Sequence, residues 1–274
     1  MKIVCLHDKN EIEALLRQNT FLHLYSIGDL DNFFWQHTTW YGLQEDTLKQ
    51  VVLVYKGCDL PVLLGLTVEP NLMAHLLRSI IHLLPRQFYA HLNENLAQVF
   101  AEDYQIQSHG LHKKMALTNS QFLANFDTSE VIQLTVENVD GIAELYRVSY
   151  PENWFNSQML ETGYYYGIRC RNNLVSIAGV HIYSSQYKVA ALGNVTTHPQ
   201  FRGQGLSKKV VARLCQELLK TVNYISLNVK ADNKIAIACY EKLGFSDIAT
   251  YEECLLTLCR LPTIAFVSRS NQKV

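Results

Sequence analysis

A short polar loop at residues 198–209, HPQFRGQGLSKK, combines residue types that can bind phosphate groups. Gly203 and Gly205 are separated by one residue, and the loop precedes an amphipathic stretch that predicts a helix. Glycines let the backbone approach an anion with no Cβ in the way, and the first N–H groups of a helix lie at the positive end of its dipole. The pattern predicts a phosphate site, and an ordinary turn that caps a helix is the alternative.

Two other phosphate-binding motifs do not fit this loop. The chain has no G-x-x-x-x-G-K-[ST] pattern, and Lys208 stands where the dinucleotide-binding fingerprint needs its third glycine. ATP hydrolysis and dinucleotide redox chemistry are therefore not favoured.

The loop instead resembles the [QR]-x-x-G-x-[GA] signature of the GNAT superfamily of N-acetyltransferases, through Gln200, Gly203 and Gly205. The preceding LGNVTTHP resembles the fourth strand of that superfamily. The segment NKIAIACYEKLGF, which begins at Asn233, resembles its second CoA-contacting motif. The two motifs are joined by a predicted helix and strand, and the resemblance covers residues 129–260.

This resemblance implies acetyl-CoA as a cosubstrate and names the residues that would hold it. The glycine loop would bind the pyrophosphate, and the backbone of the fourth strand would pair with the pantetheine arm. Asn233 would contact CoA, although helix capping explains this residue equally well. The implied cofactor-binding residues are Val195, Thr196, Thr197, Arg202, Gly203, Gln204, Gly205, Leu206, Ser207 and Asn233.

Acetyl transfer to an amine needs a deprotonated amine, donors for the oxyanion and an acid for the leaving thiolate. The resemblance assigns the acid to Tyr240, with a core tyrosine as the alternative. Many family members carry a glutamate base where this chain has Ala191, so the base is not identified. His181 is one candidate, because free imidazole titrates near about 6.5; a polar histidine on a half-exposed strand is the favoured alternative.

The acceptor side of the site is less clearly indicated. Glu152 and Trp154 fall in the segment where the superfamily shapes its acceptor pocket. The aromatic run 164–166 would place alternate rings on opposite faces of a strand. Metal binding has little support, since His109 and His112 have no cysteine or acidic ligand beside them. We therefore expect no metal site.

The elements that must position these residues alternate between strands and helices. The resemblance implies an α/β (α+β) fold with a mixed, mostly antiparallel central sheet flanked by helices. The order of elements in the first half repeats that of the second, which indicates a tandem repeat whose first copy lacks the glycine loop. We expect an N-terminal α/β domain at 1–120, a GNAT domain at 129–260 and a C-terminal tail at 261–274. Gly193, inside a predicted strand, indicates a β-bulge or a close backbone approach. Asn172 and Asn173 are suited to positive φ in the turn of a predicted hairpin.

Composition narrows the remaining classes. Hydrophobic residues make up 48% and charged residues 18% of the 274 residues, which is typical of a folded protein. The net charge of −1 gives no basic field for nucleic acid. The seven cysteines include no C-x-x-C pair, which predicts free thiols in a cytoplasmic protein. No apolar run approaches the ~18 residues of a membrane span.

Together these patterns predict an acetyl-CoA-dependent N-acetyltransferase that acts by direct attack in a ternary complex. The acceptor would be a primary amine on a small molecule or peptide, and a homodimer is compatible with this prediction. Two alternatives stay open. One is a non-catalytic acyl-CoA-binding or scaffold protein, and the other is an acyltransferase with a longer acyl-CoA donor.

Overall fold

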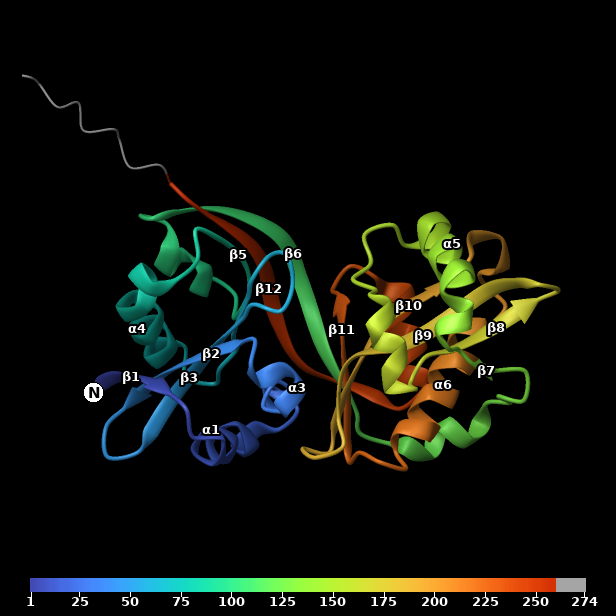
Figure 1. Ribbon diagram of the computed structural model, residues 1–274, viewed down its shortest axis with the longest axis horizontal. Helices are drawn as coiled ribbons and strands as arrows, with labels where there is room; N and C mark the ends of the chain where they lie inside the picture. The colour runs from blue at the N-terminus through green and yellow to red at the C-terminus, as the bar shows by residue number, and fades with distance from the viewer. Residues whose placement is uncertain (260–274) are drawn as a thin grey trace, which may run out of the picture.

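The computed structural model describes residues 1–259, which form two lobes joined by one continuous twisted sheet (Figure 1). The expected tail at 261–274 lies outside the described residues. The strands are β1 (Lys2–Leu6), β2 (Thr38–Gln44), β3 (Leu48–Tyr55), β4 (Val62–Gly65), β5 (Gln87–Leu92), β6 (Tyr104–Leu117), β7 (Ile132–Gln133), β8 (Tyr166–Cys170), β9 (Asn173–Ser184), β10 (Val189–Thr197), β11 (Tyr224–Lys230) and β12 (Phe245–Leu258).

Helices pack against this sheet in both lobes. The α-helices are α1 (Lys9–Leu16), α2 (Leu24–Gly28), α3 (Asn32–Trp35), α4 (Pro70–Ile80), α5 (Val139–Ser149), α6 (Leu206–Leu218) and α7 (Lys234–Lys242). Short 3-10 helices are η1 (Arg17–Asn19), η2 (Ile81–Leu83), η3 (Leu96–Phe100), η4 (Ser120–Asn125), η5 (Val136–Asn138), η6 (Ser157–Thr162) and η7 (Pro199–Phe201). No helix within residues 1–259 is long and apolar enough to cross a membrane.

The sheet order shows the same topology twice. It runs β1-β2-β3-β4-β5-β12-β6-β11-β10-β9-β8-β7. In each half, four antiparallel strands are followed by a fifth that pairs parallel to the fourth, as β5 does with β4 and β11 does with β10. A helix makes each parallel connection, α4 in one half and α6 in the other. The prediction of a mixed, mostly antiparallel sheet in a tandem arrangement is confirmed.

The two long central strands are exchanged between the halves. Neither strand stays within its own half, because β6 of the first half pairs with β11 and β12 of the second half pairs with β5. The two strands also pair with each other between Phe245–Leu258 and Tyr104–Leu117. Each has 14 residues and therefore spans about 48 Å, long enough to serve both halves. Figure 1 shows both strands running between the lobes.

Helices of the first half cover one face of the second. A single apolar cluster joins α1 and α2 to Ile182, Val189 and Ala191 of β9 and β10. The contact is close at Gly28, where an added Cβ would lie 2.1 Å from Ile182 Cγ2. The halves therefore share packed core as well as strands.

The backbone conformation tests the predictions for the bulge and for the hairpin turn. The pairing of β9 with β10 shifts register around Gly193, which confirms the predicted bulge. The sequence also suggested that Asn172 and Asn173 would take positive φ in the hairpin turn, and this was wrong. Arg171 does so instead, with φ 54°, because Asn173 already pairs with Cys170 in the ladder. All seven cysteines are free thiols.

Candidate active site

Strands β10 and β11 separate beyond their first four residues. They pair from Val189 to Leu192, and then β10 continues to Thr197 while β11 continues along β6. At the point of separation Asn194 has φ 56°. Its carbonyl accepts a hydrogen bond from the Tyr146 hydroxyl at 2.7 Å, and its Nδ2 donates to the Tyr165 hydroxyl at 3.0 Å. The backbone of residues 195–197 thus faces the gap without a strand partner on that side among the described residues.

The glycine loop lies directly after this free strand edge. Gly203 and Gly205 have φ values of 79° and 78°, a region that other residues rarely adopt. A Cβ at Gly203 would meet nothing within 4 Å, so the loop backbone is open to a ligand. The Nε of Arg202 donates to the Thr197 carbonyl at 3.1 Å, which ties the loop to β10.

The helix that follows begins without a side-chain cap. Gly205 occupies the N-cap position of α6 and offers no side-chain acceptor. The N–H groups of Leu206 and Ser207 therefore lie at the positive helix end with no intrahelical acceptor. In the first half, the corresponding helix α4 begins with Glu69 at the N-cap and Pro70 at N1. A carboxylate and a residue without an N–H do not suit an anion, so only the second half has a phosphate-binding geometry.

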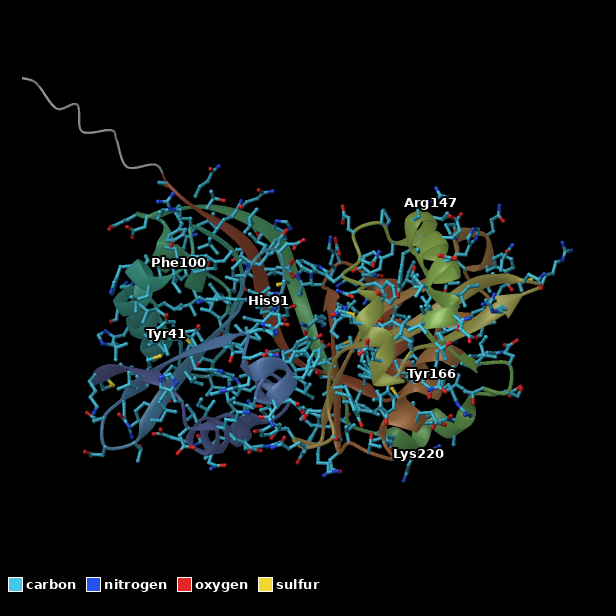
Figure 2. All side chains as sticks on the ribbon, in the orientation of Figure 1. Tyr41, His91, Phe100, Arg147, Tyr166 and Lys220 are labelled. Carbon is cyan, nitrogen blue, oxygen red and sulfur yellow. The ribbon has the colours of Figure 1, made fainter. Side chains whose placement is uncertain are left out.

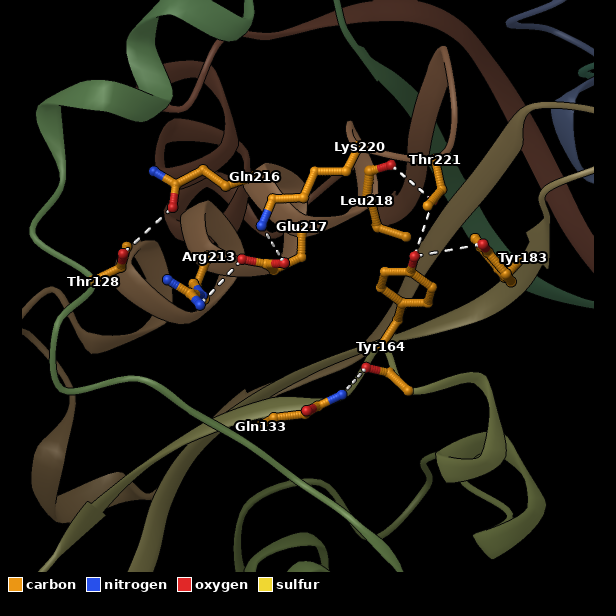
Figure 3. A network of polar contacts seen from close by, with 11 residues as sticks. Thr128, Gln133, Tyr164, Tyr183, Arg213, Gln216, Glu217, Leu218, Lys220 and Thr221 are labelled. Carbon is orange, nitrogen blue, oxygen red and sulfur yellow. Dashed lines mark hydrogen bonds and ion pairs between the residues drawn. The ribbon is translucent and has the colours of Figure 1, made fainter.

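The far end of α6 is held by a polar network (Figure 3). Glu217 accepts hydrogen bonds or ion pairs from Arg213 at 3.1 Å and Lys220 at 2.7 Å. The hydroxyls of Thr221 and Tyr164 lie 2.9 Å apart, which joins the end of the helix to the segment before β8. The buried face of the helix consists of Val210, Val211, Ala212, Leu214, Cys215 and Leu218. These contacts fix the C-terminal end and the buried face of α6.

Helix α7 presents Tyr240 to the same region. Asn233 caps this helix by accepting the Ala236 N–H at 3.1 Å, as its capping role predicted. The Tyr240 ring is buried, 5.8 Å from the ring of Phe245, and its hydroxyl makes no hydrogen bond within the described chain. Burial raises the pKa of Tyr240, and the neighbouring Cys239 and Tyr150 raise it further. The hydroxyl therefore stays protonated at neutral pH and is free to donate.

Position 191, where many family members carry a glutamate base, is covered by helices of the first half. Ala191 is fully buried beneath α1 and α2, so neither substrate nor water reaches it there. His181 is the extra residue of the β9 bulge, and its ring lies against Gly193, where an added Cβ would be 2.2 Å from it. Its Nε2 is buried without a hydrogen-bond partner in residues 1–259. Burial lowers the pKa of His181, partly offset by Asn194, so this imidazole is neutral.

The other residues considered for the acceptor side and for metal binding lie in different environments. Trp154 is 47% exposed and contacts the Tyr89 ring at 5.7 Å across the two halves. Tyr165 is fully buried, whereas Tyr164 turns to the opposite side and contacts Tyr183, as the alternation predicted. His109 packs on Tyr89.

A buried lysine was missed by the sequence analysis. Lys114 is 2% exposed; its Nζ donates to Asn228 Oδ1 at 3.2 Å and lies 4.5 Å from the centroid of the Tyr25 ring. It also lines a cavity of about 20 Å³ with His23 and His91. Burial lowers the pKa of Lys114 to about 7. The only sequence signal was the alternation of β6, which places positions 112, 114 and 116 on one face.

This lysine should make stability depend on pH. Its folded pKa of about 7 lies below the ordinary lysine value of 10.5, so folding releases a proton between these pH values and stability rises with pH. Between pH 7 and 9 we expect wild type to gain about 2 kcal/mol more than Lys114→Met in denaturant unfolding. Lys113→Met, which removes the neighbouring surface lysine paired with Asp247, is the control. Equal pH dependence in wild type and Lys114→Met would contradict the assignment.

Residues 132–245 match the model of the Acetyltransferase (GNAT) family. The glycine loop and the separated strands lie within this match, so residues 132–245 form a GNAT domain. A stretch of 59 residues is 41% identical to the [ribosomal protein bS18]-alanine N-acetyltransferase of Escherichia coli. It covers 21% of this chain and 40% of that relative, so the similarity spans less than half of the relative's length.

Solved structures show the same fold over nearly the whole chain. An acetyltransferase of the GNAT family from Colwellia psychrerythraea has a TM-score of 0.55 at 15% identity, covering 94% of this chain and all of its own. A tandem GNAT protein from the clavulanic acid biosynthesis pathway has a TM-score of 0.53 at 13% identity, covering 93% and 97%. These likenesses concern the fold, and the second agrees with the repeated topology seen here.

Proposed function

We propose that this chain is an acetyl-CoA-dependent N-acetyltransferase that moves the acetyl group to a primary amine by direct attack in a ternary complex. One observation carries the proposal. The free edge of β10 leads into two positive-φ glycines and the uncapped N-terminus of α6. A free strand edge can pair with the amides of an extended arm, and an anion site beside it can bind a diphosphate. CoA has such an amide-containing arm attached to a diphosphate.

Different residues of this surface would bind different parts of acetyl-CoA. The backbone of Val195, Thr196 and Thr197 would pair with the pantetheine amides. The N–H groups from Gly203 to Ser207 would receive the pyrophosphate, with Arg202 supplying charge. Gln204 is exposed on the loop, and Asn233 acts mainly as the cap of α7.

The chemistry requires one bond to form and one to break. The amine nitrogen attacks the thioester carbonyl, the C–N bond forms, and the C–S bond breaks as the tetrahedral intermediate collapses. An N–H of β10 near Val195 would stabilise the oxyanion. Tyr240, which is protonated at neutral pH, would give its proton to the departing thiolate, and the phenolate would regain a proton from solvent.

The proton of the acceptor amine needs a different route. Because Ala191 is sealed beneath α2, no side chain at that strand position can take the proton. His181, the extra residue of the β9 bulge, is neutral and has an unpartnered Nε2, so we propose it as the proton acceptor.

The lack of a carboxylate at the buried Ala191 favours one competing function, a non-catalytic CoA-binding or scaffold protein. The two differ in turnover, because a scaffold binds acetyl-CoA without releasing CoA thiol in the presence of amines. A longer acyl donor would show as faster turnover with butyryl-CoA or octanoyl-CoA. We further propose a cytoplasmic location, in keeping with the seven free thiols, and no metal or nucleic acid partner.

The test begins with calorimetric titration of the protein with acetyl-CoA and CoA. We expect micromolar dissociation constants, followed by thiol release when primary amines are added. If wild type binds neither ligand, the glycine loop is an ordinary turn and the proposal fails. Binding without thiol release from any amine would support the scaffold.

A further inference from the structure

A buried tyrosine of α5 contacts the backbone where β10 separates from β11. The Tyr146 hydroxyl donates a hydrogen bond to the Asn194 carbonyl at 2.7 Å, and both residues are buried. Arg147, the next residue of α5, lies on the outer side of the helix, where it pairs with Glu144 at the surface (Figure 2). Tyr146 itself is on the inner side of α5, within the core of the second half.

One hydrogen bond fixes the direction of the N–H groups at the end of β10. The His198 N–H donates to the Val175 carbonyl of β9 at 2.9 Å. Thr196, two residues earlier, pairs with Ile177 of the same strand. Because successive N–H groups of an extended strand point to opposite sides, the Val195 N–H points away from β9, toward the gap between β10 and β11.

The Tyr146 hydrogen bond and this N–H belong to one peptide group. The peptide between Asn194 and Val195 is trans, so the Asn194 carbonyl and the Val195 N–H lie in one plane and point in opposite directions. A hydroxyl that holds the carbonyl from behind therefore also sets the direction of the N–H on the gap side. The same hydrogen bond polarises the amide, which makes the N–H a stronger donor.

Side chains, rather than the sheet ladder, hold this peptide in place. Asn194 has φ 56°, a left-handed conformation that asparagine adopts more readily than most residues. The register of β9 and β10 shifts here, so Asn194 and Val195 have no ladder partners in the described sheet. Asn194 Nδ2 donates to the Tyr165 hydroxyl at 3.0 Å, and that hydroxyl donates to the Val180 carbonyl at 3.2 Å. The Tyr146 hydroxyl is the contact made directly to the peptide group.

We propose that Tyr146 is a positioning residue for acetyl transfer, which acts through the Asn194 carbonyl to aim the Val195 N–H at the thioester oxygen. This inference rests on the proposed N-acetyltransferase function, in which an N–H near Val195 stabilises the oxyanion. A donor that is fixed before charge develops needs no reorganisation during the reaction. Without the hydroxyl, the peptide is free to rotate within the bulge. The alternative is a core tyrosine whose hydroxyl contributes only to stability.

Tyr146→Phe removes the hydroxyl and keeps the ring. In thiol release from acetyl-CoA, with the primary amine that wild type uses fastest, we expect kcat to fall about tenfold and the affinity for acetyl-CoA to stay within about twofold. Tyr104→Phe is the matched control, because the buried Tyr104 also donates its hydroxyl to a backbone carbonyl, that of Pro85 at 3.0 Å. The control should keep the kcat of wild type.

A second measurement needs no turnover. Isotope-edited infrared spectroscopy of bound, carbonyl-labelled acetyl-CoA reports on hydrogen bonding to the thioester oxygen, because a donor lowers the C=O stretching frequency. Tyr146→Phe should raise this frequency relative to wild type, and Tyr104→Phe should leave it unchanged. An unchanged frequency or an unchanged kcat in Tyr146→Phe would overturn the inference.

Two variants of Asn194 test the same peptide group with Tyr146 intact. Valine rarely adopts positive φ, whereas glycine does so readily. Asn194→Val should therefore raise the C=O frequency as Tyr146→Phe does, and Asn194→Gly should raise it less. Equal frequencies in the two Asn194 variants would contradict the inference. Failure of the proposed function is different, because wild type would then bind no acetyl-CoA or release no thiol.

Discussion

Tyr240→Phe should lower kcat about a hundredfold while leaving the affinity for acetyl-CoA within about twofold of wild type. The reason lies in the surroundings of the phenol. Its hydroxyl has no hydrogen-bond partner within residues 1–259, so removing the oxygen breaks no described hydrogen bond. The thiolate of CoA would lose its proton donor, which affects only the chemical step. Stopped-flow thiol release and calorimetry measure the two quantities separately.

The control for this prediction is a tyrosine with a structural hydroxyl. Tyr104 donates its hydroxyl to the Pro85 carbonyl at 3.0 Å in the first half. Tyr104→Phe should therefore cost about 1 kcal/mol of stability with kcat unchanged.

Because the folded pKa of Tyr240 is raised above 10, its acid role should also produce no fall in kcat between pH 7 and 9. A Tyr240→Phe enzyme with full kcat would remove this residue from the mechanism.

Gly205→Trp should weaken acetyl-CoA binding by about a hundredfold, or ~2.7 kcal/mol. Gly205 is the N-cap of α6, and a large side chain there would cover the N–H groups that we propose to receive the pyrophosphate. Calorimetric titration measures the loss. The protein should remain folded, because an added Cβ meets only Lys208 Cε at 3.7 Å.

The Gly205→Trp variant also introduces backbone strain, because a tryptophan with φ 78° is strained at any position in a protein. Gly163→Trp imposes the same strain at φ 74° on the end of η6, where a Cβ would meet only Gln133 Nε2 at 3.5 Å. We expect both variants to lose similar stability and only Gly205→Trp to lose CoA affinity. Equal CoA affinity in the two variants would show that the loop does not hold the cosubstrate.

Local features of this protein could be predicted from short stretches of its sequence. The glycine loop, the apolar face of α6 and the Asn233 cap depend on residues within a few positions of one another. Helix starts and tight turns are specified by such near neighbours, since their hydrogen bonds close within one turn of chain. The bulge around Gly193 was predictable for the same reason, because it depends on one glycine inside a strand. Local prediction failed at Arg171, because the ladder pairing, rather than asparagine preference, selected which residue took positive φ.

The pairing of distant strands and the contacts between distant side chains could not be predicted in this way. Alternation along β6 and β12 predicts which residues share a face, but it does not say which strand lies beside them. Either strand could have closed its own half with the same pattern of buried residues. The exchange therefore brought Glu253 to His91 and His112, and the packing of α2 sealed Ala191. These contacts join positions more than 100 residues apart, and their energies depend on the whole assembled sheet.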